Sequence, residues 1–404
     1  MLNWRCPTNP KSGGAEYVTH KHLEAWALAC HEVHWLAGGY PGAKSYEKLP
    51  VSEITKKQCS QLSPPLSTVN SQLSTAPPLS TFDRSLSRAS RGDESQVVHL
   101  HRSGSPLTIY LLAPLLYWFK WHGDFDLVID QIHGIPFLTP LWAWRSRKIA
   151  FIHEVAQSIW DLMAPWPMNI IGKLYERLYF LLYRHIPFWV DSNSTKDDLV
   201  RYGIQPSLIH VIPCAIDLEP VAEVPEKEKT LTFIFLARLV KMKGIEDALR
   251  IIAEVKKTNP DVKLWVVGSG DSAYVSHLQN MVNELGVETN VEFKGRVDEE
   301  EKVALLRRAH WLLHTSIHEG FGLTVLEANS QGTPVAAYNS QGLNEVISVG
   351  INGHLISKSK MNTNDYNCQD MRYHSICISS IEKSSRYSWQ SIIATSINLI
   401  NDFR

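Results

Sequence analysis

Two glutamates eight residues apart enclose the segment best suited to chemistry, Glu319-Gly-Phe-Gly-Leu-Thr-Val-Leu-Glu327. Glycines followed by a helix-forming run let the backbone approach a ligand closely. The N-terminus of such a helix offers unpaired N–H groups and a partial positive charge. This pattern predicts a cradle for a diphosphate. The residues of that cradle would be Gly320, Phe321, Gly322 and Leu323.

The two glutamates can take different roles at such a cradle. Glu327 falls on the first or second helical turn, where its two oxygens can accept both hydroxyls of a ribose, and Glu319 precedes the helix and can reach a transferred sugar. A glycoside hydrolase pair is a weaker alternative, because eight helical residues span about 12 Å while hydrolase carboxylates lie roughly 5 to 9.5 Å apart. An ordinary loop–helix junction, with Glu327 on the surface, stays open as well.

A basic turn, Ala237-Arg-Leu-Val-Lys-Met-Lys-Gly244, follows an apolar run and opens a helical pattern. Arg238 and Lys243 would lie beside the carboxyl end of that strand. Two fixed cations there can offset the charge that develops on a departing nucleoside diphosphate, without a metal ion. The alternative is a solvated basic run.

The first half of the chain carries two weaker signals. Gly13 and Gly14 form a turn at the start of a helical pattern and could close over the phosphates; a plain loop is the alternative. His153 ends the apolar run 149–152, where a polar residue faces a cleft and can bond a sugar; a structural histidine is the alternative. We predict no metal site, because four further histidines lack a third ligand nearby: His31, His34, His99 and His101.

Strand and helix patterns alternate through both halves of the chain. This alternation predicts an α/β protein of two doubly wound, Rossmann-like domains facing across a cleft, with ligands at the carboxyl ends of parallel strands. The expected strands are 31–37, 96–100, 127–132, 148–153, 188–192, 231–237, 263–268, 291–294, 311–315 and 335–338, and the expected helices are 15–29, 244–258, 273–285, 299–309 and 323–331. Residues 52–95 are rich in Ser, Thr and Pro with internal copies, and we expect a disordered insertion there.

Composition excludes several classes of function. A net charge of −1 gives no basic field to hold nucleic acid. The six cysteines form no Cys-x-x-Cys pair and are too sparse for a disulfide scaffold, so a cytoplasmic location is expected. The start of the chain lacks the apolar core of a signal peptide, and the longest apolar run, 107–119, is shorter than the ~20 residues of a membrane-spanning helix.

Taken together and in order, these motifs resemble glycosyltransferase family 4, the group 1 retaining glycosyltransferases of GT-B fold. The matching pieces are Gly13-Gly-Ala-Glu16, His153-Glu154, Ser192-Asn-Ser-Thr-Lys196, Arg238 with Lys243-Gly244, Val267-Gly-Ser-Gly270, Gly295-Arg-Val297 and the segment from Glu319 to Glu327. The resemblance covers most of the chain outside the Ser/Thr/Pro-rich insertion.

The resemblance implies a division of the chain and a role for each motif. Residues 1–215 would bind the acceptor, 216–386 would bind the nucleotide-sugar donor, and a final helix within 387–404 would cross back to the first domain. Arg238 and Lys243 would bind the donor phosphates, Glu319 the donor sugar, and Glu327 the ribose. The loop at Val297 would lie by the base, and His153 beside the reacting sugar. No metal or cofactor would be needed beyond the nucleotide-diphosphate sugar, which is the donor substrate.

The resemblance leads to a functional hypothesis and two alternatives. We expect a retaining, metal-independent hexosyltransferase that moves a sugar to a glycan, lipid-linked or small-molecule acceptor, as in the synthesis of cell-envelope polysaccharide. A degenerate relative that only binds nucleotide sugar or a partner is the alternative. It is motivated by a first strand clipped to 1–4, by Ala215 where the family usually has glycine, and by weak helical periodicity in 358–385. A nucleotide-sugar epimerase is disfavoured by the spacing of the two glutamates.

Residues 160–189 add a further partner to consider. The stretch 170–184 predicts a helix with a broad apolar and aromatic face, interspersed basic residues and nearby tryptophans. Such helices bind membrane surfaces, which would suit a lipid-linked acceptor and a peripheral place at the inner face of the membrane. The same pattern is typical of a helix packed in a core, and both interpretations stay open.

Overall fold

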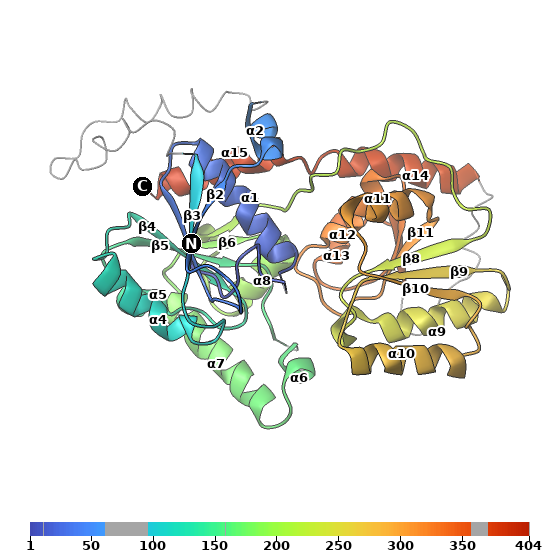
Figure 1. Cartoon of the computed structure of the whole chain (residues 1–404), viewed down its shortest axis with the longest axis horizontal. Coiled ribbons are helices and arrows are strands. Elements are labelled where there is room, and N and C mark those ends of the chain that lie inside the picture. Colours follow the sequence, from blue (N-terminus) through green and yellow to red (C-terminus); the bar gives the residue numbers. More distant parts are fainter. Residues whose placement is uncertain (11, 61–95, 158, 357–370, 404) are drawn as a thin grey trace. The chain divides into compact units, whose positions relative to one another are not determined.

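The computed structural model describes residues 1–10, 12–60, 96–157, 159–356 and 371–403. The chain divides into two compact units. Unit 1 contains 1–191, 195–214 and 388–404, and unit 2 contains 192–194 and 215–387. Each unit is built on a largely parallel sheet with helical crossovers (Figure 1), which confirms the prediction of two doubly wound, Rossmann-like domains.

Unit 2 has one six-stranded parallel sheet of order β10-β9-β8-β11-β12-β13. Counted from its first strand, this is the 3-2-1-4-5-6 order of a Rossmann fold. Helices α9 and α10 lie on one face of the sheet, and α11, α12 and α14 lie on the other (Figure 1). The elements are β8 Thr232–Leu236, η3 Lys241–Lys243, α9 Ile245–Lys256, β9 Lys263–Val267, α10 Ser272–Glu284, β10 Val291–Gly295, α11 Glu299–Arg308, β11 Trp311–His314, α12 Leu323–Ser330, β12 Val335–Tyr338, α13 Leu343–Val346, β13 Gly353–Ile356 and α14 Met371–Ser384.

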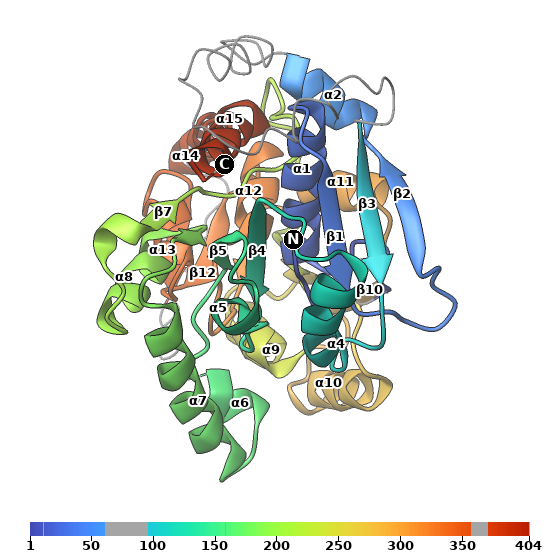
Figure 2. The ribbon, with the colours of Figure 1, turned by 90° about the vertical axis from the view of Figure 1, so that its left-hand side faces the viewer.

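The sheet of unit 1 is joined at its centre by a single residue. Leu2 forms parallel bridges to Leu36 of β1 and to Asp130 of β4, so it links the segments β2-β3-β1 and β4-β5-β6-β7. Strand β2 is antiparallel to its neighbour β3. Figure 2 shows the neighbouring strands β2, β3 and β1 side by side. The predicted clipped first strand is therefore present as this one bridging residue. A Rossmann order again results, with Leu2 as strand 1.

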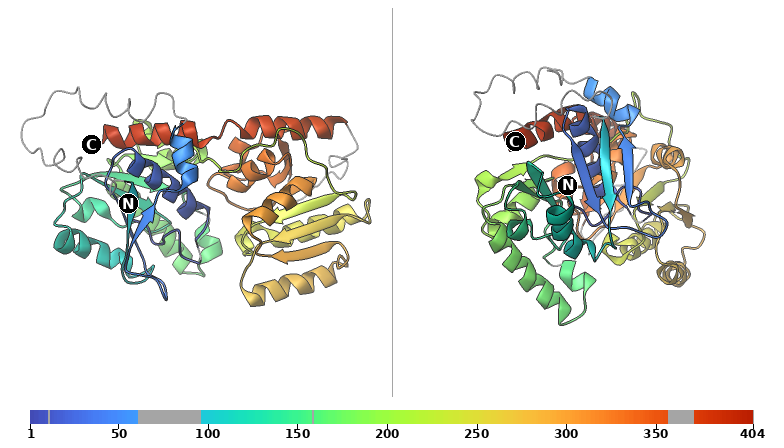
Figure 3. Two further views of the ribbon diagram at one scale, coloured as in Figure 1. Left: turned by 45° about the horizontal axis from the view of Figure 1, so that its top comes forward. Right: turned by 60° about the vertical axis from the view of Figure 1, so that its left-hand side comes forward.

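The elements of unit 1 are α1 Gly14–Leu28, β1 Val33–Ala37, β2 Tyr46–Pro50, α2 Glu53–Ser60, β3 Val97–Arg102, α4 Ile109–Leu115, the π-helical turn η1 Leu116–Lys120, β4 Leu127–Ile132, α5 Thr139–Trp142, β5 Arg147–Ile152, α6 Ile159–Met163, α7 Met168–Tyr183, β6 Phe188–Val190, α8 Asn193–Arg201, η2 Pro206–Leu208, β7 Ile209–Val211 and α15 Trp389–Asp402. Helix α15 packs on α1 and α2 (Figure 3). Ser396 of α15 lies 2.9 Å from His22 Nδ1 and accepts a bond from Trp26 Nε1 at 3.2 Å.

The structure corrects the expectations for the stretches 52–95 and 358–385 where it describes them, and it removes the concern about Ala215. The expected disordered stretch 52–95 begins instead with helix α2, and its remaining residues, 61–95, lie outside the described residues. The stretch 358–385 is not irregular where it is described, because α14 is a helix of 14 residues. Ala215 is buried and is not among the described non-glycine residues with positive φ, so it carries none of the backbone strain considered above.

No helix among the described residues is long and apolar enough to cross a membrane.

Candidate functional site

An ion pair marks the topological switch point of unit 2, where strand order reverses between β8 and β11. Lys243 ends the short helix η3 that follows β8, and Glu319 lies in the loop that follows β11. Lys243 Nζ is 2.6 Å from Glu319 Oε1. Ligands of open α/β sheets bind at the carboxyl ends of strands at this point. The structure therefore brings together two of the residues predicted from sequence.

Glu319 is held as a carboxylate by two donors on one oxygen. His314 Nε2 lies 3.2 Å from the same Oε1 that Lys243 contacts. Burial raises the pKa of Glu319, but Lys243 and His314 outweigh burial and hold that pKa well below its usual range. His314 was not predicted. As the polar last residue of a buried strand, it carries the signal that identified His153.

Close backbone packing and hydrogen bonds join the loop that carries Lys243 to the loop that carries Glu319, next to the ion pair. Gly244 has φ +71°, and a Cβ there would lie 2.0 Å from Thr315 O, so only glycine fits. Thr315 Oγ1 donates to Gly244 O at 2.7 Å, and Ile317 N donates to Met242 O at 3.0 Å. The backbone, rather than the two long side chains alone, thus brings Lys243 and Glu319 within reach.

Helix α12 begins at Leu323, shortly after Glu319, as predicted. Gly320 and Leu323 are half-buried, and Gly322, with φ +101°, is the N-cap. Phe321 is buried, and its ring centroid lies 5.8 Å from that of Tyr387. The first N–H groups of such a helix have no intrahelical acceptor and can bind an anion.

Glu327 of α12 is paired with a lysine that the sequence did not indicate. Lys302 Nζ lies 2.9 Å from Glu327 Oε1 and 2.8 Å from Glu299 Oε1. Burial raises the pKa of Glu327, against the effect of Lys302. Burial lowers the pKa of Lys302, but the two glutamates outweigh burial and raise it. Lys302 thus fixes the orientation of Glu327.

Two predicted residues lie apart from this ion-paired group. Arg238 follows β8 and is exposed, and Val297 follows β10 and is half-buried. Among the described residues, no hydrogen bond or ion pair joins either of them to Glu319. Both lie in loops at the carboxyl edge of the same parallel sheet.

In unit 1, His153 follows β5 and both of its ring nitrogens are engaged. Nδ1 bonds to Asp191 Oδ2, and Nε2 lies 2.8 Å from Gln131 Nε2. Burial lowers the pKa of His153, but the carboxylate of Asp191 outweighs burial and raises it. The predicted histidine is thus a half-buried member of a polar network, and its imidazole has no nitrogen left for a ligand in this arrangement.

The network around His153 extends to β4, to α1 and to the first residues of the chain. Gln131 Nε2 donates to Thr19 Oγ1 of α1 at 2.7 Å, and Gln131 Oε1 accepts from Asn3 Nδ2 at 2.7 Å. All three side chains are buried. Sequence reasoning missed Gln131 and Asp191, although Asp191 directly follows a buried strand and so carries the same signal as His153.

Gly13 and Gly14 lie where predicted, at the start of α1. Gly13 is the N-cap, and its N–H donates to Glu16 Oε2 at 2.8 Å. Gly13 has φ −140°, and a Cβ there would meet only Glu16 Oε2, at 3.8 Å. A side chain at position 13 would therefore fit, and one N–H of this turn already has an anionic partner.

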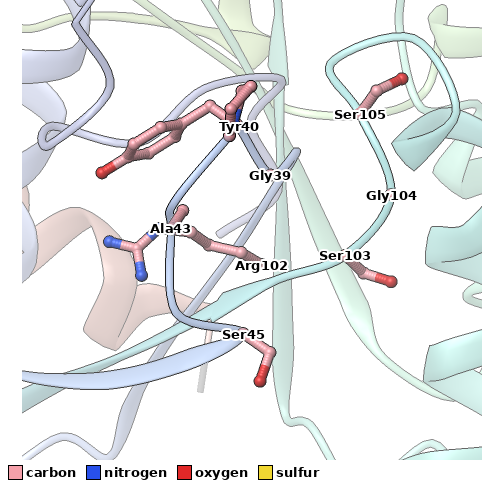
Figure 4. A pocket seen from close by; sticks show the side chains of 9 residues that line it. Gly39, Tyr40, Ala43, Ser45, Arg102, Ser103, Gly104 and Ser105 are labelled. Carbon is pink, nitrogen blue, oxygen red and sulfur yellow. The ribbon is translucent and has the colours of Figure 1, made fainter.

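A pocket of about 340 Å³ lies between the loops that follow β1 and β3 of unit 1 (Figure 4). Its charged residue, Arg102, is occupied: one terminal nitrogen donates to Thr8 Oγ1 at 2.7 Å and to Glu47 Oε2 at 2.8 Å. None of the predicted site residues lines this pocket.

Comparison with protein families identifies both halves of the chain. The family model described as "Glycosyl transferases group 1" matches residues 219–365, and the model described as "Glycosyltransferase Family 4" matches 107–220. The two matches are contiguous and together cover well over half of the chain.

Curated relatives share about half of their length with this chain. An MMP alpha-(1->4)-mannosyltransferase of Mycolicibacterium hassiacum is 27% identical over 242 residues, which is 56% of each protein. A D-inositol 3-phosphate glycosyltransferase of Corynebacterium jeikeium is 34% identical over 261 residues, 59% of this chain and 58% of the relative. The chain thus spans little more than half the length of these curated relatives.

Two solved structures share the fold over nearly the whole chain. Sucrose-phosphate synthase from Thermosynechococcus elongatus has a TM-score of 0.70 at 16% identity, covering 99% of this chain and 98% of its own. Anabaena HepE in complex with UDP-glucose has a TM-score of 0.67 at 16% identity, with the same coverage.

Proposed function

Since the chain belongs to the group 1 glycosyltransferases, glycosyltransferase family 4, we propose that it transfers a sugar from a nucleotide-diphosphate donor to a glycan, lipid-linked or small-molecule acceptor. We further propose that configuration at the anomeric carbon is retained and that no metal takes part. The observation that carries the proposal is the Lys243–Glu319 pair at the switch point of unit 2, with Glu319 in the loop that leads into helix α12.

Each part of the donor has a matching group in unit 2. Lys243 and Arg238 supply positive charge for the diphosphate, which supports a departure of the nucleotide without metal. Glu319, whose Oε1 contacts Lys243 and His314 in this structure, can accept a hydroxyl of the sugar. Glu327 is oriented by Lys302 and can accept hydroxyls of the ribose. HepE, a structural neighbour, holds UDP-glucose, which supports a nucleotide sugar as the donor.

The alternative function, binding of a nucleotide sugar without transfer, has lost two of its three motives, because Ala215 does not have positive φ and the described part of 358–385 is helical. Thermal unfolding in the presence of UDP-, GDP- and ADP-sugars, followed by a turnover assay with each stabilising donor, separates the two functions. Stabilisation without release or transfer of sugar would support the binding protein. No stabilisation by any of these donors would contradict both.

Arg238→Ala is expected to weaken nucleoside diphosphate binding by roughly 10- to 100-fold, because it removes charge-assisted hydrogen bonds to the phosphates. Calorimetric titration with UDP, GDP and ADP measures this change. The matched control is Arg250→Ala, which removes a guanidinium of the same unit that is already paired with Asp247 and Glu246. Equal effects of the two variants would contradict a specific role for Arg238.

We also propose that unit 1 binds a membrane surface. Helix α7 has a buried face and a largely apolar exposed face that includes Ile170, Ile171, Leu174, Leu178 and Leu181. Its acidic residue, Glu176, is buried, whereas Arg177 and Arg184 are exposed. A second exposed apolar row recurs at every fourth residue from the turn before α4 through η1: Leu107, Leu111, Leu115 and Phe119. Apolar faces flanked by basic side chains are typical of interfacial helices.

Replacing Leu174 and Leu178 together by glutamate is expected to reduce binding to phosphatidylglycerol vesicles by at least about tenfold, since two apolar side chains are lost and negative charge is added. Co-sedimentation measures the bound fraction. The control is Val349→Glu, which charges a side chain of unit 2 with similar exposure, 61% against 57% and 56%. The membrane proposal fails if the unaltered protein does not sediment with these vesicles.

A further inference from the structure

Lys243 and Glu319 have been assigned to two different parts of the donor, yet in this structure they contact each other. Their closest atoms are 2.6 Å apart, and only 18% and 15% of the two side chains are exposed. At this separation a buried cation and anion satisfy each other, and an ion entering the site must compete with one of them. The bond is therefore a competitor of the ligand.

The pair does not depend on chance side-chain positions. Gly244 directly follows Lys243, and Thr315 begins the loop that carries Glu319. The two residues are joined by the 2.7 Å bond from Thr315 Oγ1 to Gly244 O. Gly244 lies so close to Thr315 O that an added Cβ would not fit between the two loops. Lys243 consequently stays within reach of Glu319 whichever anion it binds.

Arg238, the other residue predicted to bind the phosphates, differs from Lys243 in its exposure and its contacts. Arg238 is exposed, and it forms no ion pair with the residues that the structure describes. An arriving diphosphate can therefore meet Arg238 without competition, whereas it gains Lys243 only by drawing it from Glu319. Glu319 keeps its second donor, His314, in that exchange.

We propose that Lys243 is exchanged between two anions, and that this exchange couples the diphosphate to the sugar. The donor diphosphate takes Lys243 from Glu319, and the carboxylate released in this way receives a hydroxyl of the donor sugar. The inference rests on the proposed function and adds a coupling between its two subsites.

The coupling favours the donor over the spent nucleotide. A nucleotide sugar supplies both an anion for Lys243 and a hydroxyl donor for Glu319. A nucleoside diphosphate without sugar takes Lys243 and leaves the Glu319 carboxylate without a new partner, at the cost of a buried charge with one bond fewer. Glu319 therefore weakens binding of the product and promotes its release.

The test is the affinity of Glu319→Gln for UDP, GDP and ADP, measured by calorimetric titration. The glutamine is isosteric but uncharged and can hold Lys243 only through a neutral amide oxygen, so affinity is expected to rise about tenfold, within the range of ordinary coupling between sites. The matched control, Glu292→Gln, removes the same charge from unit 2 at a residue paired with Lys294 and should leave affinity unchanged. In a Lys243→Met background, Glu319→Gln should give no gain.

Unchanged or weaker nucleotide binding by Glu319→Gln, or an equal gain in the Lys243→Met background, would overturn the exchange. Should Glu319→Gln fail to fold, as judged by thermal unfolding, Glu319→Asp replaces it; its shorter side chain draws the carboxylate away from Lys243 and should give a smaller gain. If the unaltered protein binds none of the three nucleotides, the proposed function itself fails. That result is distinct from the failure of the exchange.

Discussion

Glu319→Ala is expected to lower the rate of sugar transfer by on the order of 100- to 1000-fold while nucleotide binding survives. Its carboxylate is held by Lys243 and His314 at the switch point of unit 2 and is assigned to the transferred sugar. Removal should therefore cost interactions that are made to the reacting part of the donor. Turnover of the nucleotide sugar selected by thermal unfolding gives the rate, and titration with the matching nucleoside diphosphate gives the binding.

Two comparisons make this result specific. Glu292→Ala removes a glutamate of the same unit that is 58% exposed and paired with Lys294, and it should retain full turnover. Lys302→Met removes the partner of Glu327 and should weaken nucleotide binding without such a loss in rate. Undiminished transfer by Glu319→Ala would refute its catalytic role.

The second large effect is expected at Gly244. A Cβ at this position would lie 2.0 Å from Thr315 O, and φ is +71°. Gly244→Ala must therefore either separate the two loops or unfold the edge of the sheet, and a loss of about 3 kcal/mol or more in the free energy of unfolding is expected. Denaturant unfolding measures this loss, and titration should show that nucleotide binding falls with it.

Gly286 provides a matched control for the cost of a positive φ without a steric clash. It lies in the same unit with φ +65°, but nothing within 4 Å would contact an added Cβ. Gly286→Ala is expected to cost about 1 kcal/mol, from the unfavourable φ alone. If the two variants proved equally stable, close contact between the loops of Lys243 and Glu319 would not be a constraint on the fold.

Much of the fold could be predicted because buried parallel strands are continuous apolar runs and their crossover helices have one apolar face. Thr232–Leu236 and Trp311–His314 show this pattern clearly. Strand β2 was missed because it is an edge strand that buries only one of its five residues, Leu49. Helix α14 was missed because serine and β-branched residues weaken its intrinsic preference. Contacts such as Tyr373 OH to His310 O stabilise it instead.

The candidate site was predictable in its parts and not in its pairings. Glycines, a helix start and cations after a strand identified the loops of Glu319 and Lys243, because those signals are local. That the two side chains bond to each other depends on the pairing of β8 with β11, whose partners Phe233 and Trp311 are 78 residues apart in the sequence. No local pattern reveals this pairing. The same holds for His153, whose partners Gln131 and Asp191 come from neighbouring strands.

Glu16 gives the first turn of α1 a built-in ligand. Its carboxylate accepts the N–H of Gly13 at 2.8 Å and is only 4% exposed. A phosphate that bound the N–H of Gly13 would displace the carboxylate of Glu16. That carboxylate would stay buried without this donor, at a cost of about 1 to 3 kcal/mol. A neutral hydroxyl faces no such charge repulsion. We therefore expect this turn of unit 1 to bind sugar hydroxyls in preference to phosphates.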